Sequence, residues 1–154
     1  GTRFRVLFPA ATPVPPVPSA PAASGAAVAA RGGGLVLLID DEPAVRNVGR
    51  RMLEKLGYEV LTAADGRSGL ELFRERRAEI RFCLLDMTMP EMNGDEAFGA
   101  MRVLAPDVRV ILTSGYDKSE ATKRLGRGVR YAFLQKPFEQ PGLAAAIDRI
   151  LCEA

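Results

Sequence analysis

Acidic side chains follow two short apolar runs in this chain of 154 residues. Asp40 and Asp41 come directly after the run at residues 35–39, and Asp86 follows the run at residues 80–85. Carboxylates that lie close together repel one another, and a hard divalent cation such as Mg²⁺ relieves that repulsion. A carboxylate can also accept a phosphoryl group covalently. These residue types therefore predict metal-assisted phosphoryl transfer, provided that the fold brings them together.

Two further side chains of suitable chemistry follow later apolar runs. Thr113 comes after residues 108–112, and Lys136 follows residues 131–134 at a short distance. Phosphoryl transfer needs hydrogen-bond donors and positive charge around the phosphate oxygens, and a hydroxyl and an ammonium group supply them. Each residue alone has an ordinary interpretation, since an Asp pair before a helix is most often a cap. Their occurrence at four of five apolar-run ends favours one shared site.

The apolar runs alternate with segments of helical periodicity, which indicates an α/β fold with a parallel sheet. We expect a doubly wound five-stranded sheet with helices on both faces, whose ligands bind outside the carboxyl ends of the strands. The expected strands are 35–39, 58–63, 80–85, 108–112 and 131–134, and the expected helices are 43–56 (with Asp41 as its cap), 65–77, 95–104, 117–125 and 139–152.

Composition excludes several other functions. The chain has no histidine, and therefore no histidine base, histidine metal ligand or phosphohistidine of its own. Residues 35–154 are nearly neutral and lack the basic stripe of a nucleic-acid-binding protein. No segment resembles a membrane span or a secretion signal, so we expect a cytoplasmic module without membrane contact. Cys83 and Cys152 are expected to be free thiols, buried or partly buried.

The N-terminal part of the chain differs from the rest. Residues 10–34 are rich in proline, alanine and glycine, which is typical of a disordered linker. Residues 1–9 alternate apolar and other residues as a strand does, but one strand without a partner is not a domain. We expect three parts: a strand-like remnant at 1–9, a linker at 10–34 and one folded domain at 35–154.

The folded part resembles the response-regulator receiver family of two-component signalling. The resemblance spans residues 35–153 and rests on LIDDEP at 38–43, LLDMTMPEMNG at 84–94, ILTSG at 111–115 and FLQKPF at 133–138. It implies a flavodoxin-like sheet with strand order 2-1-3-4-5.

The resemblance also assigns roles to the acidic residues. Asp86 matches the residue that accepts the phosphoryl group. Asp41 matches the direct Mg²⁺ ligand, together with Asp86 and the backbone carbonyl of Thr88, while Asp40 matches an acid that acts through water. Because neither Asp40 nor Asp41 has a cationic neighbour in the sequence, we expect Mg²⁺ to be their main compensating charge.

Three further roles follow from the resemblance. Lys136 matches the lysine that contacts the phosphate, and its bond to Pro137 would be cis. Thr113 matches the hydroxyl that moves toward the phosphate on activation, which would switch the surface of the fourth helix and fifth strand. Phe133 matches the aromatic residue that then swings inward, with Tyr131 as a rival for this role.

The ends of the chain suggest its context. Residues 1–9 are similar to the closing strand of histidine-kinase ATPase domains, which implies the C-terminal receiver of a hybrid sensor histidine kinase. The chain contains no complete kinase, so its own enzymatic activity stays open. The expected partners are a phosphohistidine donor, either a kinase dimerisation domain or a phosphotransfer domain, and a downstream phosphotransfer protein. We expect a monomer or weak dimer.

Other functions remain as alternatives. The first is a stand-alone single-domain response regulator that acts by protein docking. The second is a pure interaction module, which has the same intact site but whose state is read by docking of a partner and never by catalytic turnover. An aspartyl-phosphate hydrolase would need an Asp-x-Asp nucleophile, but position 88 is threonine. A flavin-binding protein would need a phosphate-binding loop after the first strand, which the sequence lacks.

Overall fold

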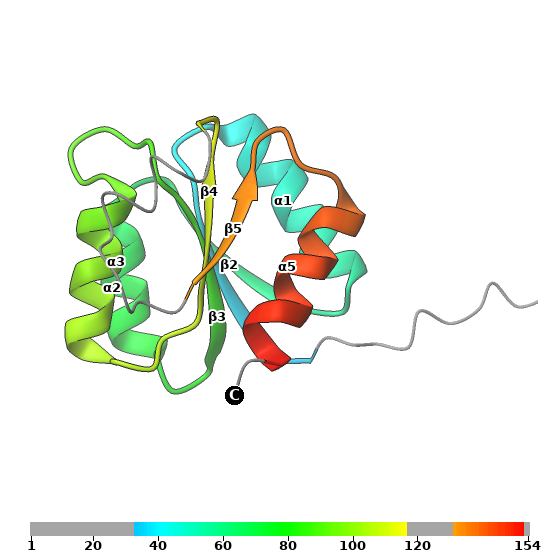
Figure 1. Ribbon diagram of the computed structural model, residues 1–154. Coiled ribbons are helices and arrows are strands. Elements are labelled where there is room, and N and C mark those ends of the chain that lie inside the picture. The colour runs from blue at the N-terminus through cyan, green and yellow to red at the C-terminus, as the bar shows by residue number, and fades with distance from the viewer. Residues whose placement is uncertain (1–32, 117–130, 153–154) are drawn as a thin grey trace, which may run out of the picture.

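The computed structural model describes residues 33–116 and 131–152, and these form one parallel sheet covered by helices (Figure 1). The strand order is β2-β1-β3-β4-β5, as the family resemblance implies. The strands are β1 (Leu35–Ile39), β2 (Glu59–Ala63), β3 (Ile80–Asp86), β4 (Val110–Ser114) and β5 (Ala132–Gln135). The helices are α1 (Pro43–Lys55), α2 (Gly66–Arg76), α3 (Gly94–Leu104) and α5 (Gln140–Cys152). The helix expected at 117–125, the strand-like segment at 1–9 and nearly all of the expected linker lie outside the described residues.

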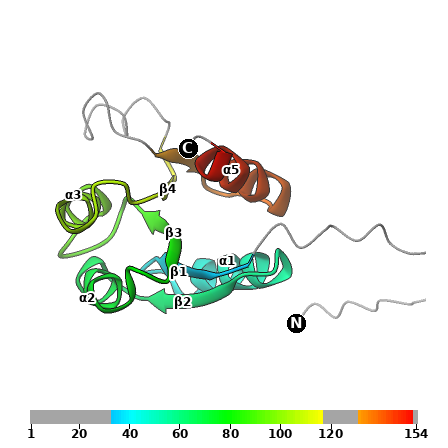
Figure 2. The ribbon, with the colours of Figure 1, turned by 90° about the horizontal axis from the view of Figure 1, so that it is seen from below.

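The helices form two layers, one on each face of the sheet. Helices α1 and α5 cover one face, and α2 and α3 cover the other (Figures 1 and 2). Each layer encloses its own apolar core, with Leu53 and Ile147 on the α1/α5 face and Phe73 and Phe98 on the α2/α3 face. Strands β1 and β4 are buried along their whole length, as expected for strands covered on both sides.

Local sequence signals account for three of the helix ends. The side chains of Asp65 and Asn93 cap α2 and α3 by accepting hydrogen bonds from the backbone. Gly57, with a φ of 90°, ends α1 in the left-handed region that favours glycine. Asp41 does not cap α1: Glu42 occupies the N-cap position and makes no side-chain cap bond. The Asp41 carboxylate therefore stays available for other contacts.

Two further expectations need correction. Strand β4 runs two residues later than predicted, because Val108 lies in a turn and its amide bonds to the carbonyl of Ala105. Both cysteines are free, but Cys152 is exposed, whereas Cys83 is fully buried in the sheet. Burial raises the pKa of the Cys83 thiol to about 12.

Candidate functional site

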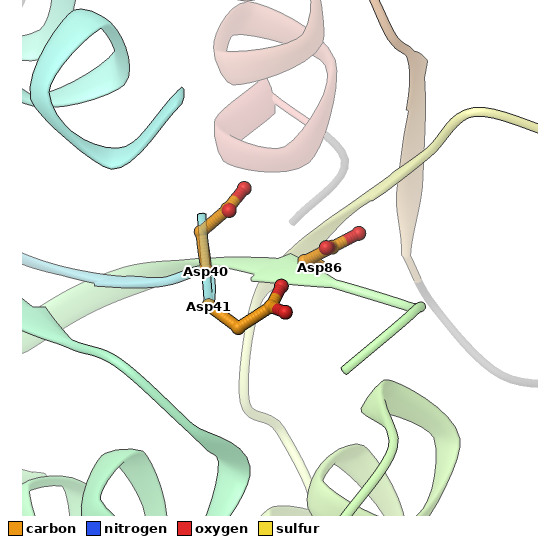
Figure 3. Close-up of side chains that lie close together, drawn as sticks. All are labelled: Asp40, Asp41 and Asp86. Carbon is orange, nitrogen blue, oxygen red and sulfur yellow. The ribbon is translucent and has the colours of Figure 1, made fainter. Parts of the chain in front are cut away.

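Three carboxylates meet at the carboxyl end of the sheet. Asp40 and Asp41 directly follow β1, Asp86 is the last residue of β3, and the two strands are neighbours (Figure 3). One oxygen from each carboxylate lies within 4.8 Å of the others. Asp40 and Asp86 are buried, whereas Asp41 is exposed. The parallel pairing of β1 and β3 therefore builds the cluster that the sequence predicts.

Lys136, just past the end of β5, connects two of these carboxylates. Its Nζ lies 2.8 Å from Oδ2 of Asp40 and 2.9 Å from Oδ2 of Asp86. The peptide bond between Lys136 and Pro137 is cis, as the resemblance implies. Asp40 has no cationic neighbour in the sequence, but the fold brings Lys136 to it across 96 residues of sequence.

One ammonium group does not neutralise this cluster. Three carboxylates and one lysine leave an excess of two negative charges. Burial raises the pKa of Asp86 above its ordinary value, and the hydrogen bond and charge of Lys136 only partly offset this. Burial also acts to lower the pKa of Lys136, but its bonds to Asp40 and Asp86 outweigh burial and raise it. The site thus holds a buried carboxylate that is incompletely compensated.

The cluster has the chemistry of a divalent-cation site. Hard cations prefer carboxylate oxygens, and Mg²⁺ in particular uses one or two carboxylates with other ligands from water or phosphate. A cavity of about 540 Å³ adjoins the cluster, lined by Asp41, Glu42, Asp86, Thr88, Gly115, Tyr116 and Lys136. The carboxylates, the excess negative charge and the open space fit a hydrated cation together with a phosphate group.

The remaining predicted site residues lie nearby. Thr88 is exposed in the loop after β3, and its amide lies 3.3 Å from Oδ1 of Asp86. Thr113 is buried and pairs with Asp86 across β3 and β4. Its hydroxyl donates to the carbonyl of Leu85 at 3.5 Å, the outer limit of a hydrogen bond. Thr113 therefore lies beside the cluster and is only weakly held.

The two candidate switch aromatics occupy the same strand edge. Phe133 lies in β5 opposite Leu112, is partly buried and packs against the α2/α3 core. Tyr131 precedes β5 and packs edge-to-face on Phe98, with ring centroids 6.5 Å apart. Thr113 pairs with Leu134, so Phe133 immediately precedes its partner on β5, and the Phe133 side chain points to the opposite face of the sheet.

Sequence analysis missed several residues of the site. Arg46 of α1 donates from Nη1 to the backbone carbonyl of Asp40, and the Glu42 amide donates to the Asp40 carboxylate at 3.0 Å. The signal for Arg46 is its position early in the helix, since helical side chains lean toward the N-terminus. Tyr116 lines the cavity with 62% of its surface exposed, and its position three residues after Thr113 carries no chemical signal of its own.

The sheet order and the acidic cluster at its carboxyl edge define a doubly wound α/β domain with a candidate cation site. The family model of the response regulator receiver domain matches residues 36–148. This chain therefore belongs to the receiver domain family of two-component systems, whose members interact with phosphohistidine donors.

Individual relatives agree with this assignment. The sensor kinase CckA of Brucella abortus is 37% identical over 120 residues, which is 78% of this chain but 13% of that protein. Sporulation initiation phosphotransferase F of Bacillus subtilis is 30% identical over 75% of this chain and 92% of its own length. Among solved structures, the receiver domain of the sensor histidine kinase PA1611 from Pseudomonas aeruginosa, with a magnesium ion in its active site cleft, has a TM-score of 0.68. It is 25% identical over 79% of this chain and all of that one.

None of the helices formed by residues 33–116 and 131–152 has the length and apolar character needed to cross a bilayer.

Proposed function

We propose that this receiver accepts a phosphoryl group on the carboxylate of Asp86. The observation that carries the proposal is the position of this carboxylate, which lies at a strand end between Lys136 and two further acidic residues. Its Oδ2 is held by Lys136 and its Oδ1 by the amide of Thr88, so its orientation is fixed. The adjoining cavity leaves room for a phosphate group beside it.

The chemistry follows from these contacts. An oxygen of Asp86 attacks the phosphorus of a phosphohistidine donor, a P–O bond forms and the P–N bond breaks. The electron pair of the broken bond stays on the donor imidazole, which takes up a proton. Lys136 lies where its ammonium can stabilise the transferred group, because its Nζ is already 2.9 Å from the Asp86 carboxylate. Raising the pKa of Asp86 by burial also makes its carboxylate more basic and hence a stronger nucleophile.

Mg²⁺ is the cofactor that we propose for this site. Asp41, Asp86 and the backbone carbonyl of Thr88 would hold it, while Asp40 would act through water. Both carboxylate oxygens of Asp40 already accept hydrogen bonds, from Glu42 and Lys136, which supports this division. When bound, the cation neutralises charge on the phosphate oxygens during transfer. The magnesium ion described for the PA1611 receiver supports the same choice.

The protein context is a second part of the proposal. We infer that the receiver belongs to a hybrid sensor histidine kinase, because its identity with CckA exceeds that with the single-domain phosphotransferase F. The donor would then be the kinase dimerisation domain or a phosphotransfer domain, with a phosphotransfer protein downstream. An apolar groove of about 410 Å³ borders Lys136 and supports docking of such a donor beside Asp86; it is lined by Glu42, Ala44, Val45, Val48, Pro137 and Phe138.

Phosphorylation would be transmitted through Thr113 and Phe133. The Thr113 hydroxyl makes only a long bond to Leu85, so a phosphate on Asp86 can recruit it at small cost. Phe133 is partly buried and precedes Leu134, the residue of β5 that pairs with Thr113, so a displacement of the Thr113 backbone would shift this strand and let the Phe133 ring repack. Phosphorylation switches usually act by shifting a protein between two discrete side-chain packings of this kind.

Acetyl phosphate, a small phosphoryl donor, tests the chemistry directly. Incubation of the chain with acetyl phosphate and Mg²⁺ should add the mass of one phosphoryl group, measured on the intact protein. The addition should disappear with EDTA and in Asp86→Asn.

Asp107→Asn is the matched control, because Asp107 is exposed in the turn before β4, away from the carboxyl ends of the strands. It should be labelled like the parent. Equal labelling of Asp86→Asn and the parent would overturn the proposal.

A further inference from the structure

The backbone and side chain of Asp40 are held on every side by the protein. Its amide donates to Ala63 at 3.2 Å, and its two carboxylate oxygens accept from Glu42 and Lys136. Its remaining polar atom, the backbone carbonyl, accepts from Nη1 of Arg46. Asp40 is only 2% exposed, so these partners replace water almost completely.

The Asp41 side chain has no comparable support. Its carboxylate makes no hydrogen bond or ion pair with the residues that the structure describes, and it is exposed. Its direction therefore depends on the backbone from which it starts. The carbonyl of Asp40 and the amide of Asp41 belong to one planar peptide unit. A bond that fixes this carbonyl also fixes the plane from which the Asp41 side chain departs.

Arg46 makes this hydrogen bond to the Asp40 carbonyl, and its place in the helix explains why. It lies early in α1, where its amide bonds to the carbonyl of Glu42 at 2.9 Å. From this position, a side chain leaning toward the helix N-terminus reaches back over the peptide that precedes the helix. The guanidinium is partly buried and bonds the carbonyl rather than a carboxylate of the cluster.

We propose that Arg46 is a positioning residue for the cation site: its guanidinium orients the Asp40–Asp41 peptide so that the Asp41 carboxylate faces Asp86. The inference rests on the proposed function, in which Asp41 and Asp86 hold Mg²⁺. Arg46 has two opposing effects on that cation. Its positive charge repels a cation nearby, whereas its hydrogen bond keeps a ligand in place.

The two effects predict opposite changes in the dissociation constant for Mg²⁺ when Arg46 is replaced. Arg46→Met keeps most of the aliphatic stem and a good helix former but removes the charge and the donor. If charge alone mattered, Mg²⁺ would bind this variant more tightly than the parent. If positioning dominates, the dissociation constant rises, and loss of a supporting hydrogen bond to a metal ligand shell typically costs about tenfold or more.

The experiment is a calorimetric titration of Mg²⁺ into the parent, Arg46→Met and Arg51→Met. Arg51 is the matched control, because it is an exposed arginine of the same helix without a contact to the site. We expect an approximately tenfold higher dissociation constant for Arg46→Met. The melting temperature should fall by a few degrees, because the buried carbonyl of Asp40 loses its donor. Arg51→Met should change the constant by less than about twofold, since an exposed charge is screened.

Equal or tighter binding of Mg²⁺ by Arg46→Met would overturn the proposal. Labelling of Arg46→Met by acetyl phosphate should be reduced at low Mg²⁺ concentration and restored by saturating Mg²⁺, because the nucleophile Asp86 is unchanged. This result would support the proposal further. Failure of the proposed function looks different: the parent itself would then bind no Mg²⁺ or take up no phosphoryl group.

Discussion

At the scale of single residues, the buried carboxylate of Asp86 has a cost in stability. Its pKa is raised by burial, so the folded state holds this proton more tightly than the unfolded state does. In the window between the ordinary and the raised pKa, folding therefore becomes less favourable as the pH rises. The ionised form that accepts phosphate is the form that destabilises the fold.

This cost predicts that Asp86→Asn stabilises the protein when Mg²⁺ is absent. The amide has almost the same shape but no charge, so at neutral pH the melting temperature should rise by a few degrees. The gain should shrink as the pH falls through the raised pKa of the folded state toward the ordinary value of about 4, because the carboxyl of the folded parent becomes protonated over this window. Calorimetric melting of both proteins in EDTA across this range measures it. A variant that melts below the parent at neutral pH would contradict this account of the site.

Sequence reasoning succeeded for the residues whose position follows from strand ends. Asp40, Asp41, Asp86 and Lys136 come together because parallel strands end at one edge of the sheet. It failed for the contact of Arg46, since a helix pattern does not show which backbone atom a long side chain reaches. The Lys136–Asp40 pair was missed for a related reason: it depends on which strands are neighbours in space.

At the scale of elements, the N-terminus of α3 packs tightly against the end of β3. A Cβ at Gly94 would lie 2.3 Å from the carbonyl oxygen of Asp86 and 2.7 Å from Cα of Met87. These are backbone atoms and cannot rotate away. Gly99, in the same helix, is exposed, and a Cβ at this position would meet nothing within 4 Å. The two glycines of α3 thus differ in what surrounds them.

The same substitution should therefore have opposite effects at these positions. Gly99→Ala should stabilise the protein by about 0.5–1 kcal/mol, because alanine favours a helix over glycine. Gly94→Ala should destabilise it by about 1–3 kcal/mol, since overpacking forces the backbone of Asp86 to move. Denaturant unfolding measures both, and acetyl phosphate labelling should slow only in Gly94→Ala. A Gly94→Ala variant as stable and as readily labelled as Gly99→Ala would refute this tight packing.

The first residue of β4 shows that the hydrophobic pattern alone does not fix where a strand begins. Strand β4 was expected at 108–112 but runs from Val110 to Ser114. The apolar residues of this segment begin already at Val108, so hydrophobicity does not mark the start of the strand. The start is set by pairing with β3, where Cys83 faces Val110. The register between two strands depends on both of them, so the sequence of one segment does not determine it.

At the scale of the whole molecule, the fold connects the acidic cluster to β5 through the end of β4. Thr113 pairs with Asp86 on one side and with Leu134 on the other, so it lies between the site and the strand edge. A change at Asp86 can therefore reach β5 through one residue. The Thr113 hydroxyl supplies the group that a phosphate would attract.

Thr113→Ala should consequently separate phosphorylation from its structural effect. The variant should still accept phosphate from acetyl phosphate, because Asp86 and Lys136 are intact. With the phosphate mimic beryllofluoride and Mg²⁺, amide chemical shifts of β5 should change in the parent and much less in the variant. Thr62→Ala is the control, since Thr62 is exposed on the edge strand β2. If Thr113→Ala and the parent respond alike, the signal does not pass through this hydroxyl.

Locating the phosphoryl group tests the central claim most directly. Borohydride reduces an aspartyl phosphate to homoserine, so that treatment of the phosphorylated chain followed by peptide mass spectrometry identifies the modified residue. Modification at position 86 alone is the result that the geometry predicts, because among the three clustered carboxylates this one is both held by Lys136 and open to the cavity. Homoserine at position 40 or 41, or at no aspartate of the chain, would contradict it.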